Sequence, residues 1–377
     1  MFIVGLGTAA PPHRYSQQEC WEALQVSSHF ALLRPRSQAI LRKVLLGDNG
    51  VETRHLCLNS LGEAFRLHPD DLHARFAKNA PALAAQAAER ALDESGAARS
   101  DIDALLISTC TGYLCPGLTS YVSERLGLRA DVVALDLVGQ GCGAAIPNLR
   151  TAHALLASGQ CRCALSICVE VCSAAFYLDD DPGVLVSACL FGDGAGAAVV
   201  SNQPYANRRR IRWLAASSAL CPADRDLLRF ELKGGMLRNI LSLRVPEVSA
   251  QQAEAVLART LGRAGVDRNR VATWILHAGG RDVLLELRER LKLEEKDLRW
   301  SAQTLRDFGN VSSPSVLFAL EAACAGRAPT GYWWLSAFGA GFTCHGALLE
   351  VEEIASIGTE GIEHKTPENL VQPAHVI

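Results

Sequence analysis

The chain has 377 residues, of which 49% are hydrophobic, and acidic and basic residues nearly balance at a formal net charge of −3. This composition is that of a folded protein with a large core, long enough for two domains or one duplicated domain. It excludes a disordered chain, and the mixed charges leave no basic stripe for nucleic acid.

The N-terminus and the cysteines indicate the cellular compartment in which the protein is expected. The opening residues, MFIVGLGTAAPPHRYSQ, have no basic lead and no small-residue cleavage site, so we expect no signal peptide. Apolar runs stay below the roughly 18 residues of a membrane span, so none is expected. Thirteen cysteines, an odd number without a secretion signal, predict free thiols in a cytoplasmic protein. Their spacing lacks the paired CxxC and histidine partners of a zinc site, and we predict no metal.

Apolar runs alternate with helix-length segments in the first half of the chain. Strands buried on both faces are predicted at 103–109, 132–137 and 163–170. Helices that end at a glycine are predicted at 80–96 and 143–159. This alternation is typical of layered α/β structure.

The same order of elements begins again in the second half. A strand, a glycine turn and a helix occur around Cys142 and again around His277. We therefore expect a duplicated architecture, with one half at 1–205 and the other at 206–377. The polar segment after Glu350 is expected to be loosely ordered. The predicted elements of the second half are strands at 210–218 and 271–277, a helix at 249–265 and another from about Asp282.

Cys142 lies in the stretch LVGQGCGAAIPNL, between two glycines and just before a predicted helix. Glycine is tolerated where the backbone bends sharply or approaches another group closely. A sulfur at the start of a helix lies near free backbone N–H groups and the positive end of the helix dipole, which favours the reactive thiolate. The alternative is a cysteine that fills a tight corner between strand and helix.

Two further polar residues occur on similar turns. His277, in WILHAGG, ends an apolar strand before two glycines, and Asn310, in FGNVSSPS, precedes a helix. Taken singly, the first is explained as a structural hydrogen bonder and the second as ordinary turn chemistry. Together with Cys142 they form a set suited to acyl transfer, in which a thiolate carries an acyl group and two donors stabilise an oxyanion. A papain-like hydrolase uses the same residue types, but its CGSCW motif is missing.

Five motifs in order are similar to those of the type III polyketide synthases, the chalcone synthase-like family. The likeness extends from VGLGTAAPPHRYSQ to about Glu350. It implies a thiolase fold with two similar αβαβα-layered halves, assembled as a homodimer. It also implies an acyl-CoA starter and malonyl-CoA as substrates, with no separate cofactor. The motifs are GQGCGAA, LFGDGAGAAVV, WILHAGG, FGNVSSPSVLF and AFGAGFT.

The resemblance also implies roles for single residues. Cys142 matches the acyl-binding nucleophile, and His277 and Asn310 match the pair that decarboxylates malonyl-CoA and stabilises the enolate. Phe191 matches a gatekeeper ring between the CoA tunnel and the cavity, although an ordinary core phenylalanine would look the same. Ser312 matches a serine that shapes the cavity. Phe338, in AFGAGFT, is assigned to the same pocket.

The remaining pocket positions differ from the plant pattern. Cys110 and Thr111 replace the first two residues of a TSG motif, and Cys115 precedes its proline. Such a pocket should not hold a coumaroyl group as the plant enzymes do. It looks more like that of bacterial members, which use malonyl, aliphatic or fatty acyl starters. The extra cysteines are pocket lining or a second reactive thiol. Two threonines and a phenylalanine of the plant pattern are replaced by Cys172, Ala175 and Asn239.

The segment LRKVLLGDNGVETRH supplies the candidate cations for CoA, which are Arg42, Lys43 and Arg54. Two other functions remain open on the residues alone. A ketoacyl-ACP synthase III shares the fold and the three residue types, but expects an HQAN-like context where this chain has HAGGRD. A non-catalytic acyl-binding partner with the same fold is the second alternative.

Overall fold

The computed structural model describes residues 1–205 and 209–353. Nine strands of the described residues form one mixed sheet. They are β1 (Phe2–Ala9), β4 (Ala104–Ser108), β5 (Val133–Leu137), β6 (Cys163–Glu170), β7 (Gly194–Ser201), β8 (Arg209–Leu220), β11 (Val271–Leu276), β12 (Gly331–Gly339) and β13 (Thr343–Glu353). Their order in the sheet is β11-β12-β13-β8-β1-β7-β6-β4-β5.

Two short antiparallel pairs complete the strands, β2 (Arg14–Ser16) with β3 (Thr53–His55) and β9 (Leu228–Lys233) with β10 (Met236–Leu241). Two 3-10 turns matter for the site, η3 (Gly141–Gly143) and η4 (Cys172–Ala175). The α-helices are α1 (Gln17–Gln25), α2 (Ser28–Leu32), α3 (Pro35–Leu46), α4 (Pro69–Ser95), α5 (Leu118–Leu126), α6 (Ala145–Ala157), α7 (Pro182–Leu190), α8 (Val245–Ala264), α9 (Arg281–Arg290), α10 (Arg299–Phe308) and α11 (Ser315–Ala325).

The sheet contains the same strand pattern twice. In the first half, β1 pairs with β7 and β7 with β6, both antiparallel, and β6 pairs with β4 in parallel. In the second half, β8, β13, β12 and β11 repeat this sequence of directions. A short pairing of β1 with β8 joins the halves. The duplicated α/β architecture expected from the sequence is therefore confirmed, and the division between residues 205 and 206 stays a prediction.

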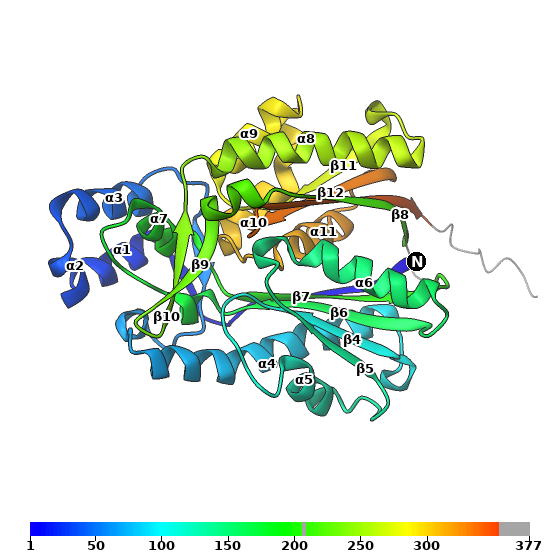
Figure 1. Ribbon diagram of the computed structural model, residues 1–377, viewed down its shortest axis with the longest axis horizontal. Helices are drawn as coiled ribbons and strands as arrows, with labels where there is room; N and C mark the ends of the chain where they lie inside the picture. Colours follow the sequence, from blue (N-terminus) through cyan, green and yellow to red (C-terminus); the bar gives the residue numbers. More distant parts are fainter. Residues whose placement is uncertain (206–208, 354–377) are drawn as a thin grey trace, which may run out of the picture.

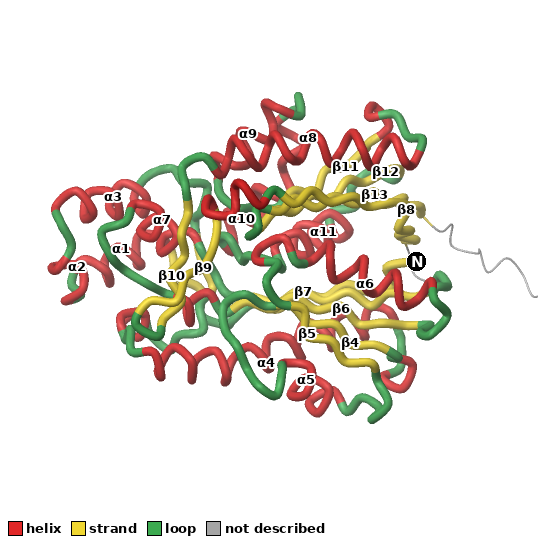
Figure 2. Tube along the Cα trace, in the orientation of Figure 1, coloured by secondary structure: helices red, strands yellow, loops and turns green. Residues whose placement is uncertain are grey.

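The two halves of this sheet form separate layers, with helices outside each half and between them. The layers therefore follow one another as helix, sheet, helix, sheet, helix (Figure 1). Helices α4 and α5 cover the first half of the sheet, α8 and α9 cover the second half, and α6 and α11 lie between the two (Figure 2). Three apolar clusters fill the spaces between these layers. The cluster around α6 and α11 includes Leu149, Leu320 and Trp333. Both inner helices begin directly after turns that carry predicted site residues, Cys142 before α6 and Asn310 before α11.

Most predicted elements are found within a few residues; one helix begins much earlier than predicted, and one strand differs in its burial. The helix predicted at 80–96 begins earlier, at Pro69, because proline is well suited to the first turn of a helix. Pro81 lies inside this helix and does not end it. The strand predicted at 132–137 is not buried on both faces. As β5 it forms the edge of the sheet, and Val133 is 39% exposed. The predicted loose segment after Glu350 lies, beyond Glu353, outside the described residues.

Candidate active site

Cys142 lies in η3, directly before the inner helix α6. Gly139 and Gly141 adopt positive φ angles of 84° and 55°, which explains why this turn is rich in glycine. Gly143 is needed for a different reason. A Cβ there would lie 3.0 Å from Cδ2 of His345 and 3.3 Å from the backbone N of Gly339. The turn therefore packs directly against the second half of the molecule.

The Cys142 side chain is enclosed rather than exposed. The residue is 8% exposed, and Ser312 Oγ donates a hydrogen bond to its Sγ at 3.2 Å. The pKa of Cys142 is raised to about 12, mainly by burial and to a smaller extent by the nearby Glu170, against the hydrogen bond from Ser312, which lowers it. The thiolate expected from the helix dipole is therefore not the state of the free site. Without a partner for its proton, Cys142 remains a thiol.

His277 follows β11 and is buried at the floor of the site. Its backbone N–H donates to Ser336 O at 2.8 Å, and the next N–H, of Ala278, donates to Ser315 Oγ. Its ring makes an edge contact with Phe338 at a centroid distance of 4.9 Å. Burial lowers the pKa of His277 to about 3, so the imidazole is neutral. Its Nδ1 has no hydrogen-bond partner among the described residues.

Asn310 lies in the turn that leads into α11, and its amide is fixed at both ends. Nδ2 donates to Gly279 O at 3.1 Å, and Oδ1 accepts the N–H of Ser312 at 2.8 Å. Its backbone N–H donates to Leu190 O. One N–H of the amide remains for another acceptor, because an NH₂ group carries two.

These contacts join the three predicted residues into one site. Cys142 accepts from Ser312, Ser312 donates its backbone N–H to Asn310, and Asn310 reaches Gly279, two residues after His277. Ser312 has a φ of 58°, which is uncommon for a residue with a side chain. A strained backbone at the centre of such a contact chain is typical of functional sites.

Glu170, at the end of β6, belongs to the same site and was not predicted. It is fully buried and accepts hydrogen bonds only from donors around the nucleophile. Burial raises its pKa. A glutamate after an apolar strand looks like a solvated charge in a sequence, since its partners lie far away along the chain. These donors are Thr109 Oγ1, the N–H and Sγ of Cys110, Thr111 Oγ1, Ser312 Oγ and Ser313 Oγ.

A small enclosed cavity adjoins Ser312 and has a volume of about 30 Å³. Six predicted pocket residues line it, namely Thr111, Cys172, Ala175, Phe191, Asn239 and Ser312. Phe230 also lines it and was not predicted. Phe230 on β9 pairs with Asn239 on β10. The aromatic ring missing at position 239 is thus supplied from across the hairpin.

Three other predicted pocket residues lie elsewhere. Cys110 is placed beside the site, where its Sγ donates to Glu170 and lies 3.6 Å from Ser312 Oγ. Cys115 is exposed and outside the cavity of this chain, so its assignment to the lining is not supported. Phe338 is buried against the His277 ring and does not line this cavity, so its assignment to the substrate pocket stays a prediction.

The predicted CoA cations separate into two kinds. Arg42 and Lys43 are exposed on α3. Arg54 is 3% exposed, and its guanidinium donates to the carbonyls of Ala188 and Phe191. Arg54 therefore fixes the end of α7 from inside and is not available to a surface ligand.

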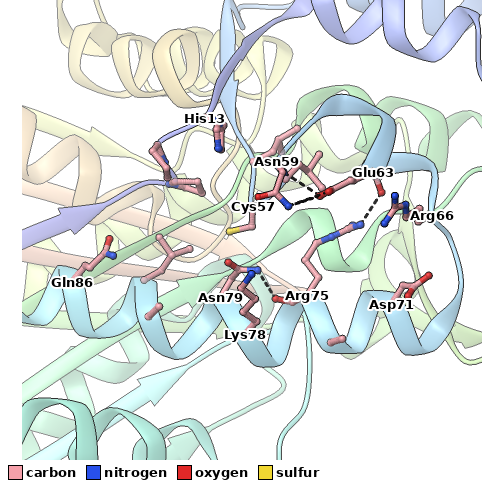
Figure 3. Close-up of a pocket in the computed structure, with 17 residues that line it drawn as sticks. His13, Cys57, Asn59, Glu63, Arg66, Asp71, Arg75, Lys78, Asn79 and Gln86 are labelled. Atoms are coloured by element: carbon pink, nitrogen blue, oxygen red, sulfur yellow. Dashed lines mark hydrogen bonds between the residues drawn. The ribbon is translucent and has the colours of Figure 1, made fainter.

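A larger cavity, of about 390 Å³, lies outside this site, between α4 and the segment that follows β3 (Figure 3). No predicted site residue lines it. Its polar groups bind one another, since Arg75 donates to Glu63 O and Asn59 donates to the Glu63 carboxylate. Within the described residues, no group of three or more His, Cys, Asp or Glu side chains could hold a metal ion.

The lowered pKa of His277 predicts a pH-dependent contribution to stability. Below pH 6.5 the unfolded chain takes up a proton at this histidine, while the folded chain does not until about pH 3. The stabilisation is therefore complete above pH 6.5 and is lost as the pH falls, by about 1.4 kcal/mol per pH unit. From pH 6.5 to pH 4.5, the free energy of unfolding of the wild type should fall by about 2.5 kcal/mol relative to His277→Gln.

Urea unfolding of both proteins across this range checks the prediction. Glu170 and Asp193, whose pKa values burial raises, titrate in both proteins and cancel in the difference. Parallel stability curves for wild type and variant would show that His277 is not held neutral.

A buried thiol that opens an inner helix of one half, next to polar side chains from the other half, is the arrangement of thiolase-fold acyltransferases. Comparison with known proteins narrows this class. The chain belongs to the chalcone and stilbene synthase family, whose N-terminal domain matches residues 2–204 and whose C-terminal domain matches residues 214–352. It is a type III polyketide synthase, an acyltransferase that performs decarboxylative condensations.

The chain is similar to several bacterial enzymes over nearly its whole length. It is 33% identical over 352 residues to a 1,3,6,8-tetrahydroxynaphthalene synthase of Streptomyces peucetius subsp. caesius, covering 92% of each chain. It is 31% identical over 359 residues to a 3,5-dihydroxyphenylacetyl-CoA synthase of Streptomyces toyocaensis, covering 92% of this chain and 89% of the other. The crystal structure of the Streptomyces coelicolor A3(2) tetrahydroxynaphthalene synthase has a TM-score of 0.84 at 25% identity, covering 94% of this chain and 100% of that one.

The family decides between the functions left open by the residues. Membership in the type III polyketide synthases, at 92% coverage, excludes the ketoacyl-ACP synthase III and the non-catalytic partner. Among the described residues, no helix combines the length and apolar character that crossing a membrane requires.

Proposed function

We propose that this enzyme loads a short acyl group from CoA onto Cys142, extends it repeatedly with malonyl-CoA and cyclises the chain to a pyrone, resorcinol or related phenol. The observation that carries the proposal is the chain of contacts from Cys142 through Ser312 and Asn310 to the loop of His277. It connects a buried thiol with two further polar groups, and Ser312, which links them, also lines the cavity.

The chemistry follows from these groups. Neutral His277 takes the Cys142 proton, and the sulfur attacks the starter thioester, so that a new C–S bond forms and CoA leaves with the proton. Burial keeps Cys142 and His277 neutral when each is considered alone, because it disfavours a single charge. In the ionised pair, the attraction between the thiolate and the imidazolium offsets this cost of burial. Malonyl-CoA then loses CO₂, and the electron pair of the broken C–C bond forms an enolate. His277 and Asn310 stabilise the oxygen of this enolate. The enolate carbon attacks the acyl-Cys142 carbonyl, a C–C bond forms, and the Cys142 thiolate is released.

The size of the cavity supports a short starter. At about 30 Å³ the space is that of roughly one water molecule, so even an acetyl group must displace the surrounding side chains, and a longer chain must displace more of them. Phe176, Phe191 and Phe230 all border it. Long-chain acyl and coumaroyl groups would need these rings to move, which costs packing energy.

Product analysis of the purified enzyme tests the function. Malonyl-CoA should be supplied with acetyl-, hexanoyl-, long-chain acyl- or coumaroyl-CoA, and products identified by mass spectrometry. We expect pyrone or resorcinol masses with the short starter and none with the long-chain and coumaroyl starters. If the enzyme forms no product with any of these starters, and none with malonyl-CoA alone, the proposal is contradicted.

Replacing Phe230 with alanine should widen the cavity and admit longer starters. Removing a ring leaves space for several methylene groups, and one methylene in such a pocket is worth about 1–3 kcal/mol of discrimination. The ratio of kcat/KM for hexanoyl-CoA to that for acetyl-CoA should therefore rise by about tenfold or more. Leu232→Ala is a matched control, because Leu232 lies on the same strand, is 76% exposed and is outside the cavity. An unchanged ratio for Phe230→Ala would remove Phe230 from the determinants of starter length.

The proposal has three further parts. The enzyme is a homodimer, it is located in the cytoplasm, and Arg42 and Lys43 contact CoA. The exposed edge strand β5 supports the dimer, because an unpaired strand edge is a template for pairing with a second chain. Val133 and Val138 are exposed apolar residues at this edge, at 39% and 64%. The thirteen cysteines are all free, which is typical of a reducing compartment. Light scattering should give twice the mass of one chain.

A further inference from the structure

Asn239 is the polar residue of the cavity whose side chain the protein leaves unused. The residue is 7% exposed, and its Oδ1 is enclosed without a hydrogen-bond partner among the described residues. A buried polar atom without a partner costs about 1–3 kcal/mol, so native structures usually provide one. The hydrogen bonding of this wall is therefore incomplete until a polar group occupies the cavity.

Three hydroxyls of the cavity are already engaged, while the hydroxyl of Tyr177, which also lines it, takes no part in these contacts. Thr111 Oγ1 donates to Glu170, Ser187 Oγ donates to Gly183 O, and Ser312 Oγ donates to Cys142. None of these groups is free to recognise the far end of an acyl chain. Among the lining residues, Asn239 is one whose buried side-chain oxygen is unpaired and can take that role.

The position of Asn239 is fixed by its surroundings. On one side of it, Arg238 forms ion pairs with Asp179 at 2.7 Å and with Glu231 at 2.8 Å. Across the hairpin, Asn239 pairs with Phe230. An anchored amide opposite an aromatic ring can orient a ligand, since the cost of ordering it has already been met during folding.

We propose that Asn239 selects acyl chains that carry an oxygen beyond the thioester carbonyl, such as an acetoacetyl or malonyl group, over hydrocarbon chains of the same size. This inference rests on the proposed function. A terminal amide both donates and accepts hydrogen bonds. A β-keto chain, in its keto and enol forms, offers a carbonyl to Nδ2 and a hydroxyl to Oδ1. A methyl group in the same place leaves the amide buried and unpaired.

Competition between two starters of nearly the same shape tests the inference. Acetoacetyl-CoA and 3-methylbutanoyl-CoA differ in that a methyl group and a hydrogen replace the keto oxygen. Loading of Cys142 by each is read by mass spectrometry of the intact protein. The wild type should favour acetoacetyl by about tenfold, because a site built to bind an oxygen rejects the analogue that lacks it. In Asn239→Leu the preference should fall to about equality.

Ser187→Ala is the matched control. It removes a hydroxyl from the same wall, but one that is already bonded to Gly183 O, so the wild-type preference should persist. Thermal unfolding of each variant shows whether the fold is intact, and the wild-type ratio alone remains informative if Asn239→Leu does not fold.

Equal loading of the two starters by the wild type would overturn the inference and leave the proposed function standing. An unchanged preference in folded Asn239→Leu would do the same. If Cys142 accepts no acyl group from either CoA ester, or from the starter panel, the proposed function falls and this inference with it.

Discussion

Replacing Cys142 with alanine should abolish polyketide formation while malonyl-CoA decarboxylation continues. Without the sulfur no acyl-enzyme forms, so chain extension should fall by roughly 10⁴-fold or more. Decarboxylation depends instead on stabilisation of the enolate oxygen, which we assign to His277 and Asn310. Release of labelled CO₂ and product formation, measured in the same reaction, separate the two steps.

A second thiol beside the nucleophile makes the control important. Cys110 lies next to Ser312 and donates to Glu170, and burial raises its pKa well above the usual value. Cys110→Ala should therefore retain extension and the acyl adduct on Cys142. Polyketide formation by Cys142→Ala, together with its loss in Cys110→Ala, would transfer the nucleophile to Cys110.

The regular elements were predictable because their signals are local. The apolar runs at 103–109 and 163–170 become β4 and β6 with bounds within one or two residues. The predicted strand at 132–137 has the same apolar character, yet β5 lies at the edge of the sheet. The number of neighbours that a strand has is a property of topology, which periodicity does not encode.

The three candidate catalytic residues stand out in the sequence for a related reason. Cys142, His277 and Asn310 are each marked by glycines at the end of an element, and the positive φ of Gly141 shows why such a turn needs them. The groups that surround them carry no such mark. Glu170 takes hydrogen bonds from residues 60 and 143 positions away in the chain.

Burial is the quantity that the sequence predicted least well. Arg54 resembles a surface cation in VETRH, but its guanidinium is enclosed by backbone carbonyls. Cys142 resembles a helix-start thiolate, but enclosure by the second half raises its pKa to about 12. In both cases a neighbour from a distant segment determines whether the charged form is stable.

Replacing Asn310 with alanine should lower malonyl-CoA decarboxylation by roughly 10²- to 10³-fold, the usual effect of removing one donor to a developing oxyanion. The amide is bonded to Gly279 O and to the N–H of Ser312, which leaves one N–H directed by two fixed contacts. A donor held in this way stabilises an enolate without reorganising. The measurement is best made in the Cys142→Ala background, where extension does not consume the enolate.

Two further variants decide what the amide does. Asn79→Ala removes a half-buried amide in the cavity outside the site and should leave the rate unchanged. Asn310→Asp keeps an oxygen to accept the Ser312 N–H but loses both N–H groups of the amide, so it should be as slow as Asn310→Ala, and thermal unfolding shows whether it remains folded. If Asn310→Asp and Asn310→Ala both decarboxylate malonyl-CoA within about threefold of the background, the amide supports the turn before α11, and the enolate oxygen must be held by His277 and by backbone N–H groups instead.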